Sequence, residues 1–306
     1  MEGFGPLKSY IKALRAPFLA GSIAPVIIGT AYAIIEGHFS ISPFLVTVVG
    51  IGALHLGANM LNDYYDAGGS DPINVRLTPF SGGSRVIQNG EIAPRTILAM
   101  VIFFFALSFL TALWLAYRGR PLVFVIGFLG LLAGWSYSAP PLQFMARGWG
   151  EVVIFFAFGP LITLGTHYVM TGSLSLNAFL IGAPQGFLIT GVIWINQFPD
   201  YIADKEAGKK NLVVRLGPRL SRSIYCLIMI FAFAYIPFLI GVIGISYLIL
   251  ITLISSPLAF KAMKIAWKEY LSHEGIIPAQ ALTIQTVIAQ GLLLSLGLFL
   301  SRFIHV

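Results

Sequence analysis

Long stretches of this 306-residue chain contain no Asp, Glu, Lys or Arg, and these stretches limit what the chain can fold into. Only 10% of the residues are charged and 57% are hydrophobic, whereas about a quarter of the residues in soluble domains are charged. A helix of about 20 apolar residues crosses the hydrocarbon core of a bilayer. The sequence therefore predicts an all-α membrane protein and argues against a water-soluble enzyme.

Seven charge-free stretches predict nine transmembrane helices in a bundle. Two of them, 152–199 and 223–260, are long enough for two helices each, and turn-forming residues at 171–175 and near 241–246 divide them. We predict that residues 1–306 form a single transmembrane domain. The other five stretches each fit one helix: 16–35, 37–62, 96–117, 121–146 and 275–301.

The basic residues predict how this bundle lies in the membrane. With nine helices, 16 of the 19 Lys and Arg fall on the side where the chain begins, and three fall on the opposite side. Cytoplasmic loops of membrane proteins carry such an excess of basic residues. We therefore predict a multi-pass protein of the cell membrane, with a cytoplasmic N-terminus and the C-terminus outside. The net charge of +7 then reflects topology, and we expect no nucleic-acid partner.

The first of two acidic motifs closes the second predicted helix. Asn62 and Asp66 are four residues apart, so they lie on one helical face. Asp63 lies between them, and Asp71 follows in the polar loop 62–95. Of the 12 acidic residues, 11 fall on the predicted cytoplasmic side, which the basic excess does not require. This concentration of carboxylates predicts a functional site there.

The second acidic motif closes the sixth predicted helix and repeats the first. Asn196, Asp200 and Asp204 follow one another at intervals of four, and they open the polar loop 196–222. Helices two and six end on the same side of the membrane in a nine-helix bundle. We therefore expect the two motifs to form one site.

The ligand chemistry of the motifs predicts a hard cation. Grouped carboxylates repel one another unless a cation or protons lie between them. The motifs offer only carboxylate and amide oxygens, without Cys or His, which suits Mg²⁺, Mn²⁺ or Ca²⁺ and argues against zinc or copper. Mg²⁺ commonly takes one or two carboxylates and fills its shell with water and phosphate oxygens. Two facing half-sites would clamp a diphosphate between two Mg²⁺ ions.

Groups that favour a diphosphate follow both motifs. The glycine-rich segment 81–84 can present backbone N–H groups to phosphate oxygens, and Lys or Arg stabilise charge on a leaving diphosphate. A plain loop and the membrane topology also explain these residues, so only their combination with the acidic motifs carries weight. Arg15, directly before the first helix, could face the diphosphate as well. The candidate diphosphate-binding residues are Arg76, Arg85, Lys205, Lys209 and Asn196.

At these residues the sequence resembles the UbiA superfamily of intramembrane aromatic prenyltransferases. The matching segments are the first motif at 62–66, the second at 200–204, and Ser-Tyr-Ser-Ala-Pro-Pro at 136–141, followed by Gly-Trp-Gly-Glu at 148–151. Nine helices with the site on the cytoplasmic side are also expected of that family. The resemblance thus covers nearly the whole chain.

Two further segments are most similar to the naphthoate prenyltransferases of menaquinone and vitamin K2 synthesis. They are Pro-Phe-Ser-Gly-Gly-Ser-Arg-Val-Ile at 79–87 and Gly-Lys-Lys at 208–210. Branches of the superfamily that act on 4-hydroxybenzoate, haem or geranylgeranylglyceryl phosphate typically carry Asn-x-x-x-Arg-Pro after the first motif. Residues 74–79 lack the adjacent Arg-Pro, which weakens those acceptors without excluding them.

The resemblance implies a role for each motif residue. Asn62 and Asp66 would hold one Mg²⁺, and Asp200 and Asp204 would hold the other. The remaining candidates form a catalytic group in which Asp63 supports the site, Asp71 holds metal or accepts a proton, and Tyr137 lies beside the reacting groups. On composition alone, an aromatic anchor at the membrane interface explains Tyr137 equally well.

The implied activity is transfer of a polyprenyl group from polyprenyl diphosphate to an aromatic quinone precursor, with Mg²⁺ as cofactor. His55, seven residues before Asn62 on roughly the same face, is interpreted as a hydrogen-bonded packing residue. Prenyl transfer to a non-aromatic lipid such as geranylgeranylglyceryl phosphate stays open. A cation-coupled secondary transporter is the alternative from another class, although its acids would lie near the bilayer midplane. A CDP-alcohol phosphotransferase would need a continuous acidic block that the chain lacks.

Overall fold

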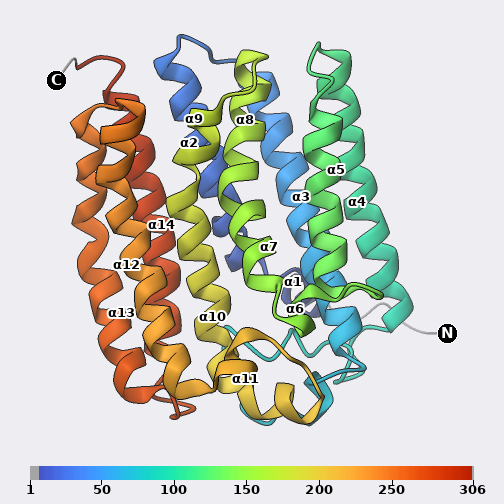
Figure 1. Cartoon of the computed structure of the whole chain (residues 1–306). Helices are drawn as coiled ribbons and strands as arrows, with labels where there is room; N and C mark the ends of the chain where they lie inside the picture. Colours follow the sequence, from blue (N-terminus) through green and yellow to red (C-terminus); the bar gives the residue numbers. More distant parts are fainter. Residues whose placement is uncertain (1–6, 305–306) are drawn as a thin grey trace.

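The computed structural model describes residues 7–304, and every regular element in that range is helical. The long helices run side by side in a bundle (Figure 1). The helices are α1 (Leu7–Leu14), α2 (Ala20–Ile35), α3 (Ile41–Asp66), α4 (Pro94–Tyr117), α5 (Val123–Ser138), α6 (Phe144–Arg147), α7 (Gly150–Phe156), α8 (Ile162–Thr171), α9 (Leu176–Ile181), α10 (Ala183–Glu206), α11 (Leu212–Leu216), α12 (Pro218–Ile243), α13 (Ser256–Glu269) and α14 (Ile277–Leu300). Short 3₁₀ or π segments cover Ala16–Leu19, Asp71–Ile73, Ala157–Leu161 and Tyr247–Ser255.

Within residues 7–304, eight helical segments have the length and apolar composition needed to cross a bilayer. Several of them join two shorter elements end to end, as α7 and α8 join through Ala157–Leu161, which we call the π segment. The chain is therefore an integral membrane protein. The eight segments are Leu7–Ile35, Ile41–Asp66, Pro94–Tyr117, Gly150–Thr171, Leu176–Glu206, Pro218–Ile243, Tyr247–Glu269 and Ile277–Leu300.

The helix observed within the predicted span 121–146 is shorter than that span. This helix, α5, has 16 residues and ends at Ser138. Ala139 is extended because it precedes Pro140, and a residue before proline is driven out of the helical region. The rest of the stretch turns and forms the short helix α6. The nine-span count and the orientation of the termini stay predictions.

The turns that divide the two longest apolar stretches lie where the sequence predicts them. The helix α8 ends at Thr171, and Gly172 follows with a φ of 85°. In the same way α12 ends at Ile243 before Gly244, whose φ is 73°. Glycine is favoured at such left-handed helix ends because it has no Cβ. Each long stretch therefore folds into two antiparallel helices.

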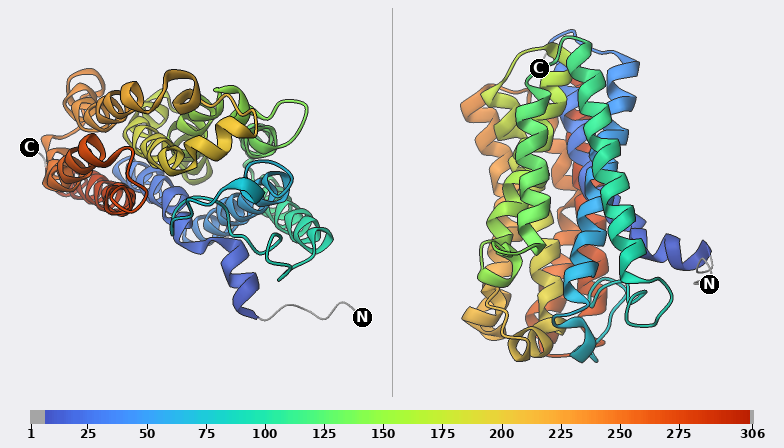
Figure 2. Two further views of the ribbon diagram at one scale, coloured as in Figure 1. Left: turned by 90° about the horizontal axis from the view of Figure 1, so that it is seen from below. Right: turned by 90° about the vertical axis from the view of Figure 1, so that its right-hand side faces the viewer.

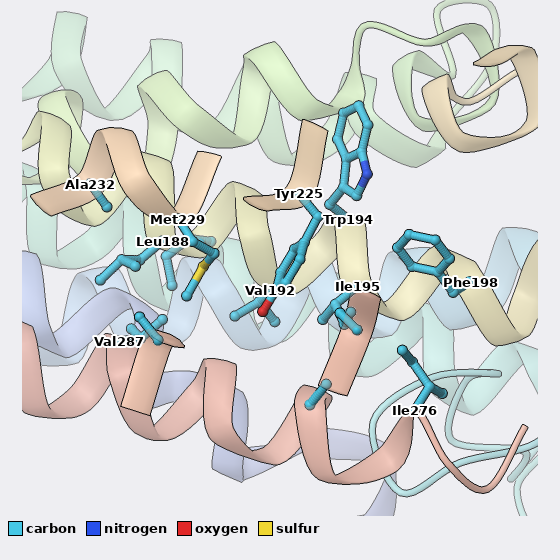
Figure 3. Packing of buried hydrophobic residues seen from close by; sticks show 14 of the residues in the cluster. Leu188, Val192, Trp194, Ile195, Phe198, Tyr225, Met229, Ala232, Ile276 and Val287 are labelled. Atoms are coloured by element: carbon cyan, nitrogen blue, oxygen red, sulfur yellow. The ribbon is translucent and has the colours of Figure 1, made fainter. Parts of the chain in front are cut away.

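The largest buried cluster joins α10 to α12 and α14 (Figure 3). Leu188 and Val192 on α10 lie between Met229 of α12 and Val287 of α14, and all four side chains are buried. A buried hydrogen bond also joins α10 to α14, since Gln185 Nε2 donates to Gln290 Oε1 at 2.8 Å. The cluster fixes α10, which carries the second motif.

The outward faces of the bundle are apolar. Phe103 and Phe109 of α4 are 61% and 58% exposed, and Phe231 and Val242 of α12 are 54% and 60% exposed. Exposed apolar surface of this extent is unusual for a soluble monomer and normal for helices that face lipid.

Both motif loops lie at one end of the bundle (Figure 1). The loop after α3 and the segment around α11 meet there, and α1 projects from the same end (Figure 2). The turns that follow α2 and α8 lie at the opposite end (Figure 1). The antiparallel packing thus brings together two motifs that are separated by 134 residues.

Candidate functional site

The two acidic motifs face one cavity of about 120 Å³, which we call the polar cavity. The end of α3 forms one wall and the end of α10 forms the opposite wall, while the two motif loops cover it. The predicted pairing of the motifs is thereby observed. Predicted site residues that line the polar cavity are Asn62, Asp66, Asp71, Tyr137, Asn196, Asp200, Asp204 and Lys209.

Lys209 lies between the two motifs. Its Nζ is 2.8 Å from Asp66 Oδ1 and 3.3 Å from Asp204 Oδ1, and the Lys209 side chain is only 13% exposed. Burial alone would lower the pKa of Lys209, but the two carboxylates outweigh burial and raise that pKa above its ordinary value. A positive charge is therefore held where the two motif carboxylates face each other.

Three of the motif carboxylates each accept a hydrogen bond from a different amide side chain. Asn62 Nδ2 donates to Asp66 Oδ2 at 3.2 Å within the first motif. Asn74 and Asn211 donate to Asp200 Oδ1 and Asp204 Oδ2 at 2.7 and 2.8 Å. Sequence reasoning missed Asn74 and Asn211. The available signal was an amide residue inside each motif loop, and both prove to be buried.

The glycine-rich segment 81–84 turns the first loop back over α3. Gly82 and Gly83 have φ values of 82° and 72°, and a Cβ at Gly83 would collide with the Asp71 carboxylate. Glycine is required for this combination of left-handed backbone and close approach. The turn brings the Ser84 N–H to within 3.3 Å of both Asp63 carboxylate oxygens. Gly82 and Gly83 themselves line the polar cavity.

Asp63 supports the site from behind. It is 3% exposed and does not contribute to the polar cavity lining. Besides Ser84, its partner is Arg15, whose Nη1 is 3.7 Å from Asp63 Oδ1. Arg15 lines the polar cavity, so the carboxylate of Asp63 fixes a guanidinium at its wall.

Asp71 is the loop carboxylate of the first motif. Gln88 Nε2 donates to Asp71 Oδ2 at 3.0 Å, and Arg85 Nη1 donates to the backbone carbonyl of Asp71. Burial, followed by repulsion from Asp66 and Asp63, raises the pKa of Asp71 to about 6. A carboxyl group with this pKa can exchange a proton near neutral pH.

Three predicted diphosphate-binding residues do not line the polar cavity. Arg76 Nη2 donates to the Leu271 carbonyl at 2.8 Å, outside it. Arg85 binds the backbone of the first loop, and the exposed Lys205 lies 5.9 Å from the centre of the Tyr201 ring. Diphosphate contacts of these three residues stay predictions.

A second, apolar cavity of about 240 Å³ lies next to the polar cavity, and we call it the apolar chamber. Residues of α2, α3, α4, α5, α7, α8 and α10 line it, together with the short segments Ala16–Leu19 and Ala157–Leu161. Its wall is mostly aliphatic and aromatic, with residues such as Leu54, Phe158 and Ile189. Five residues line both spaces: Arg15, Asn62, Tyr137, Ile193 and Asn196. The site therefore combines a charged compartment and an apolar compartment with a shared wall.

Glu151, in the Gly-Trp-Gly-Glu segment, is a buried carboxylate that ties α7 to the second motif. It is 3% exposed. Gln197 Nε2 donates to Glu151 Oε1 at 2.9 Å, and the backbone N–H of Leu212 lies 3.4 Å from the same oxygen. Glu151 thus holds both the end of α10 and the start of α11, which position Asp200 and Asp204.

The donor set around the polar cavity suits a hard divalent cation. Its ligand atoms are carboxylate and amide oxygens, and four aspartates face two basic side chains, Arg15 and Lys209. Across residues 7–304, no three His, Cys, Asp or Glu side chains converge as a ready-made metal centre. Mg²⁺ accepts such incomplete protein half-sites because water and substrate phosphate oxygens fill its shell.

Comparison with known proteins identifies the fold and the activity. The sequence profile described as the UbiA prenyltransferase family matches residues 22–275, which is most of the chain. The chain belongs to the UbiA prenyltransferase family. The resemblance inferred from the acidic motifs is thereby confirmed, and the protein is a prenyltransferase that transfers polyprenyl groups.

Relatives with this assignment align along nearly their whole length. The 1,4-dihydroxy-2-naphthoate octaprenyltransferase of Escherichia coli (strain K12) is 28% identical, over 97% of this chain and 96% of its own. The Bacillus subtilis (strain 168) protein of the same name is 25% identical, over 94% and 91%. A UbiA homolog from Archaeoglobus fulgidus, solved bound to GPP and Mg²⁺, superimposes with a TM-score of 0.65 at 18% identity, covering 94% of this chain and 99% of that one.

Proposed function

We propose that this prenyltransferase moves a polyprenyl group from its diphosphate to an aromatic quinone precursor, and that it uses Mg²⁺. The shared wall of the polar cavity and the apolar chamber is the observation that carries the proposal. A polyprenyl diphosphate has a charged head and an apolar tail, and the two adjoining compartments match those two parts. Residues 1–306 act as one catalytic domain, with the polar cavity on the cytoplasmic side.

Four motif residues would hold the metal. Asn62 and Asp66 form one half-site on α3, and Asp200 and Asp204 form the other on α10. Bound Mg²⁺ would neutralise the diphosphate and stabilise the charge that develops as it leaves. The Archaeoglobus fulgidus homolog, which was solved with GPP and Mg²⁺ bound together, supports this choice of cation.

The chain's own residues supply the remaining steps. Lys209 and Arg15 place positive charge beside the diphosphate, so the allylic carbon gains cationic character as its bond to oxygen breaks. The apolar chamber takes the tail and keeps water from the reactive carbon. The aromatic ring forms the new carbon–carbon bond, and Asp71 accepts the proton that the ring loses. Tyr137, in both linings, lies beside the reacting groups.

The acceptor is best assigned to the naphthoate class. Two relatives that align with more than nine-tenths of this chain are named for 1,4-dihydroxy-2-naphthoate. The segments 79–87 and 208–210 support the same branch. Both segments lie in the loops around the polar cavity, where Gly82, Gly83 and Lys209 contribute to its lining.

Purified protein with Mg²⁺, geranylgeranyl diphosphate and a panel of acceptors tests the proposal. We expect prenylated 1,4-dihydroxy-2-naphthoate and diphosphate in equal amounts, and loss of both with EDTA. Asp66→Ala and Asp200→Ala should abolish turnover, whereas Glu36→Ala should retain it because Glu36 lies in the turn between α2 and α3, at the other end of the bundle (Figure 1).

Two outcomes would contradict the proposal. Product from geranylgeranylglyceryl phosphate and none from any phenolic compound would assign a lipid acceptor. Uptake of a solute into liposomes that depends on Asp66, without Mg²⁺-dependent release of diphosphate, would assign transport. Full turnover in Asp66→Ala and Asp200→Ala would remove the two motifs from the reaction.

A further inference from the structure

We propose that His55 and Asn59, on the α3 wall of the apolar chamber, bind an oxygen substituent of the aromatic acceptor and thereby select it. The inference rests on the proposed function and adds the residues that recognise the acceptor. Both residues line the apolar chamber, and neither lines the polar cavity.

Each of the two side chains has a polar atom without a hydrogen-bond partner among residues 7–304. His55 is 7% exposed, and its Nε2 is buried and makes no hydrogen bond. Asn59 Nδ2 is also buried and unpartnered, and its amide makes no side-chain hydrogen bond within residues 7–304. Buried polar atoms without partners are uncommon, because the lost contact with water is not replaced, and Thr166 Oγ1 is a further such atom at a residue that lines the chamber. A ligand in the chamber can supply the missing partner.

The hydrogen bond of the other imidazole nitrogen defines what His55 can offer. Its Nδ1 lies 2.5 Å from Ser22 Oγ on α2, and this is the one side-chain partner of the Ser22 hydroxyl across the described residues. We assign the hydroxyl as the donor to Nδ1, because the hydroxyl makes no other side-chain hydrogen bond within residues 7–304, and this tautomer carries the ring proton of the neutral imidazole on Nε2. Phe158 packs edge-on against the ring at 5.3 Å between centroids and holds its orientation. His55 Nε2–H and Asn59 Nδ2–H are thus two donors, which call for a ligand oxygen.

The position of the pair places that oxygen near the reaction. His55 and Asn59 are four residues apart on α3, so they lie on one face about 6 Å apart along the helix axis. Asn59 is one turn before Asn62, whose side chain reaches both the polar cavity and the chamber. An aromatic ring held at this level lies between the diphosphate site and the deeper, mostly apolar part of the chamber. A polyprenyl tail has no oxygen to pair with these donors, so the pair fits the acceptor.

The structure also accounts for the simpler interpretation of His55 as a packing residue. Its Nδ1 bond to Ser22 and its contact with Phe158 do join α2 and α3 to the π segment. Packing does not explain why Nε2 and Asn59 Nδ2 both stay unpaired one turn apart. A packing role and a recognition role therefore predict different kinetics for variants that keep the shape of the side chain.

Variants of similar size separate the two roles. His55→Phe and Asn59→Leu remove the donors, and His55→Gln keeps a donor near the position of Nε2. We expect the first two to reduce kcat/KM for 1,4-dihydroxy-2-naphthoate by about tenfold or more, because a site with unpaired donors discriminates strongly. The KM for geranylgeranyl diphosphate should stay within about twofold, and His55→Gln should recover part of the loss. His38→Phe and Asn177→Leu are the matched controls, since neither residue lines either space.

Trimmed acceptors identify the oxygen that is bound. Two analogues of 1,4-dihydroxy-2-naphthoate are each assayed with wild type and with Asn59→Leu. One lacks the carboxylate and the other lacks the 4-hydroxyl. The compound that lacks the bound oxygen should lose little further activity in the variant, because the interaction is already absent. If Asn59→Leu reduces activity with both trimmed compounds as much as with the intact acceptor, the proposal is overturned. A rise in KM for geranylgeranyl diphosphate as large as the rise in KM for the acceptor would also overturn it.

The activity of wild type distinguishes an error in the proposed function from an error in the recognition role of His55 and Asn59. If wild type makes no prenylated aromatic product, the proposed function is wrong, and the pair has no acceptor to bind. If wild type is active and His55→Phe and Asn59→Leu match their controls, only the recognition role is wrong. A variant that is inactive with every acceptor and melts lower than wild type by circular dichroism would assign the residue to packing.

Discussion

Lys209 shows how one side chain can tie the two motifs together. Its ammonium group contacts Asp66 of α3 and Asp204 of α10, so it links helices that approach each other only in the folded protein. Taking one partner from a buried charge group leaves the others uncompensated. The charge balance of the polar cavity therefore depends on Lys209 when no cation is bound.

We predict that Lys209→Met lowers the free energy of unfolding by about 3 kcal/mol in EDTA, because Asp66 and Asp204 lose their counter-charge. Excess Mg²⁺ should restore more stability to this variant than to wild type, since a bound cation replaces the missing charge. Thermal unfolding in detergent measures both effects. Lys210→Met is the control, because the neighbouring Lys210 is exposed. Equal Mg²⁺ stabilisation of wild type and variant would contradict the prediction.

Asp71 gives the site a predicted pH dependence. Its pKa is raised to about 6, and the deprotonated form is the one that can accept a proton. Activity should therefore fall as the pH drops below about 6, and this acidic limb should be missing from the residual activity of Asp71→Asn. A cation beside Asp66 would favour the charged carboxylate, so higher Mg²⁺ should shift the limb to lower pH. A profile of kcat against pH at two Mg²⁺ concentrations decides this, and an unchanged limb in Asp71→Asn would exclude Asp71 as the base.

At the scale of single residues, the sequence predicted the motif aspartates but not the groups that orient them. Asp66, Asp200 and Asp204 are visible in the sequence because acids are rare in an apolar chain and recur at a spacing of four. Asn74 and Asn211 contact these acids only through long-range folding of the loops. No local pattern encodes such a pairing, so the supporting amides needed the structure.

Helices pack most closely where a glycine, which has no side chain, lies at the contact. A methyl group on Gly159, in the π segment, would lie 2.5 Å from the Gly182 carbonyl and would collide with the backbone nitrogen of Gly186 on α10. Small residues allow membrane helices to approach to backbone contact. The contact holds the π segment, between α7 and α8, against α10, and these elements contribute to the wall of the apolar chamber.

Gly159→Ala should therefore destabilise the protein by about 1–3 kcal/mol, the usual cost of forcing an extra methyl into a packed contact. Gly241→Ala on α12 is the control, because nothing lies within 4 Å of its added Cβ. Midpoints of thermal unfolding for both variants, measured in the same detergent, provide the test. A midpoint for Gly159→Ala equal to that of wild type would show that the contact between the π segment and α10 can accept a methyl group.

The sequence predicted where the long helices lie more reliably than where each helix ends. Charge-free stretches located the long helices, and turn residues placed the breaks at Gly172 and Gly244. The absence of charged residues extended the fourth predicted span to residue 146, whereas α5 ends at Ser138, shortly before two prolines. An apolar run continues through such a backbone break, so composition overestimates the helix there.

At the scale of the whole molecule, the charge distribution and the fold agree about the two ends of the bundle. The sequence assigns 16 of 19 basic residues and 11 of 12 acids to one side of a nine-helix topology. In the fold, the loops that carry both motifs meet at one end, together with α1 (Figure 1). The sequence could predict this segregation because it depends on the order of helices and loops. It could not predict the polar cavity, which depends on how the loops fold over the helix ends.

The single cysteine, Cys226, allows a direct test of the predicted orientation in the membrane. In a Cys226→Ser background, Ser173→Cys labels the turn between α8 and α9, and Lys210→Cys labels the second motif loop, where both residues are exposed. An excess of basic residues favours the cytoplasmic side, so an impermeant maleimide should label only the Ser173 variant in intact cells. Permeabilised cells should label both. Labelling of the Lys210 variant alone would reverse the orientation and place the acidic motifs outside. Labelling of both variants in intact cells would mean that the segment between them, Leu176–Glu206, does not cross the bilayer despite its length and composition.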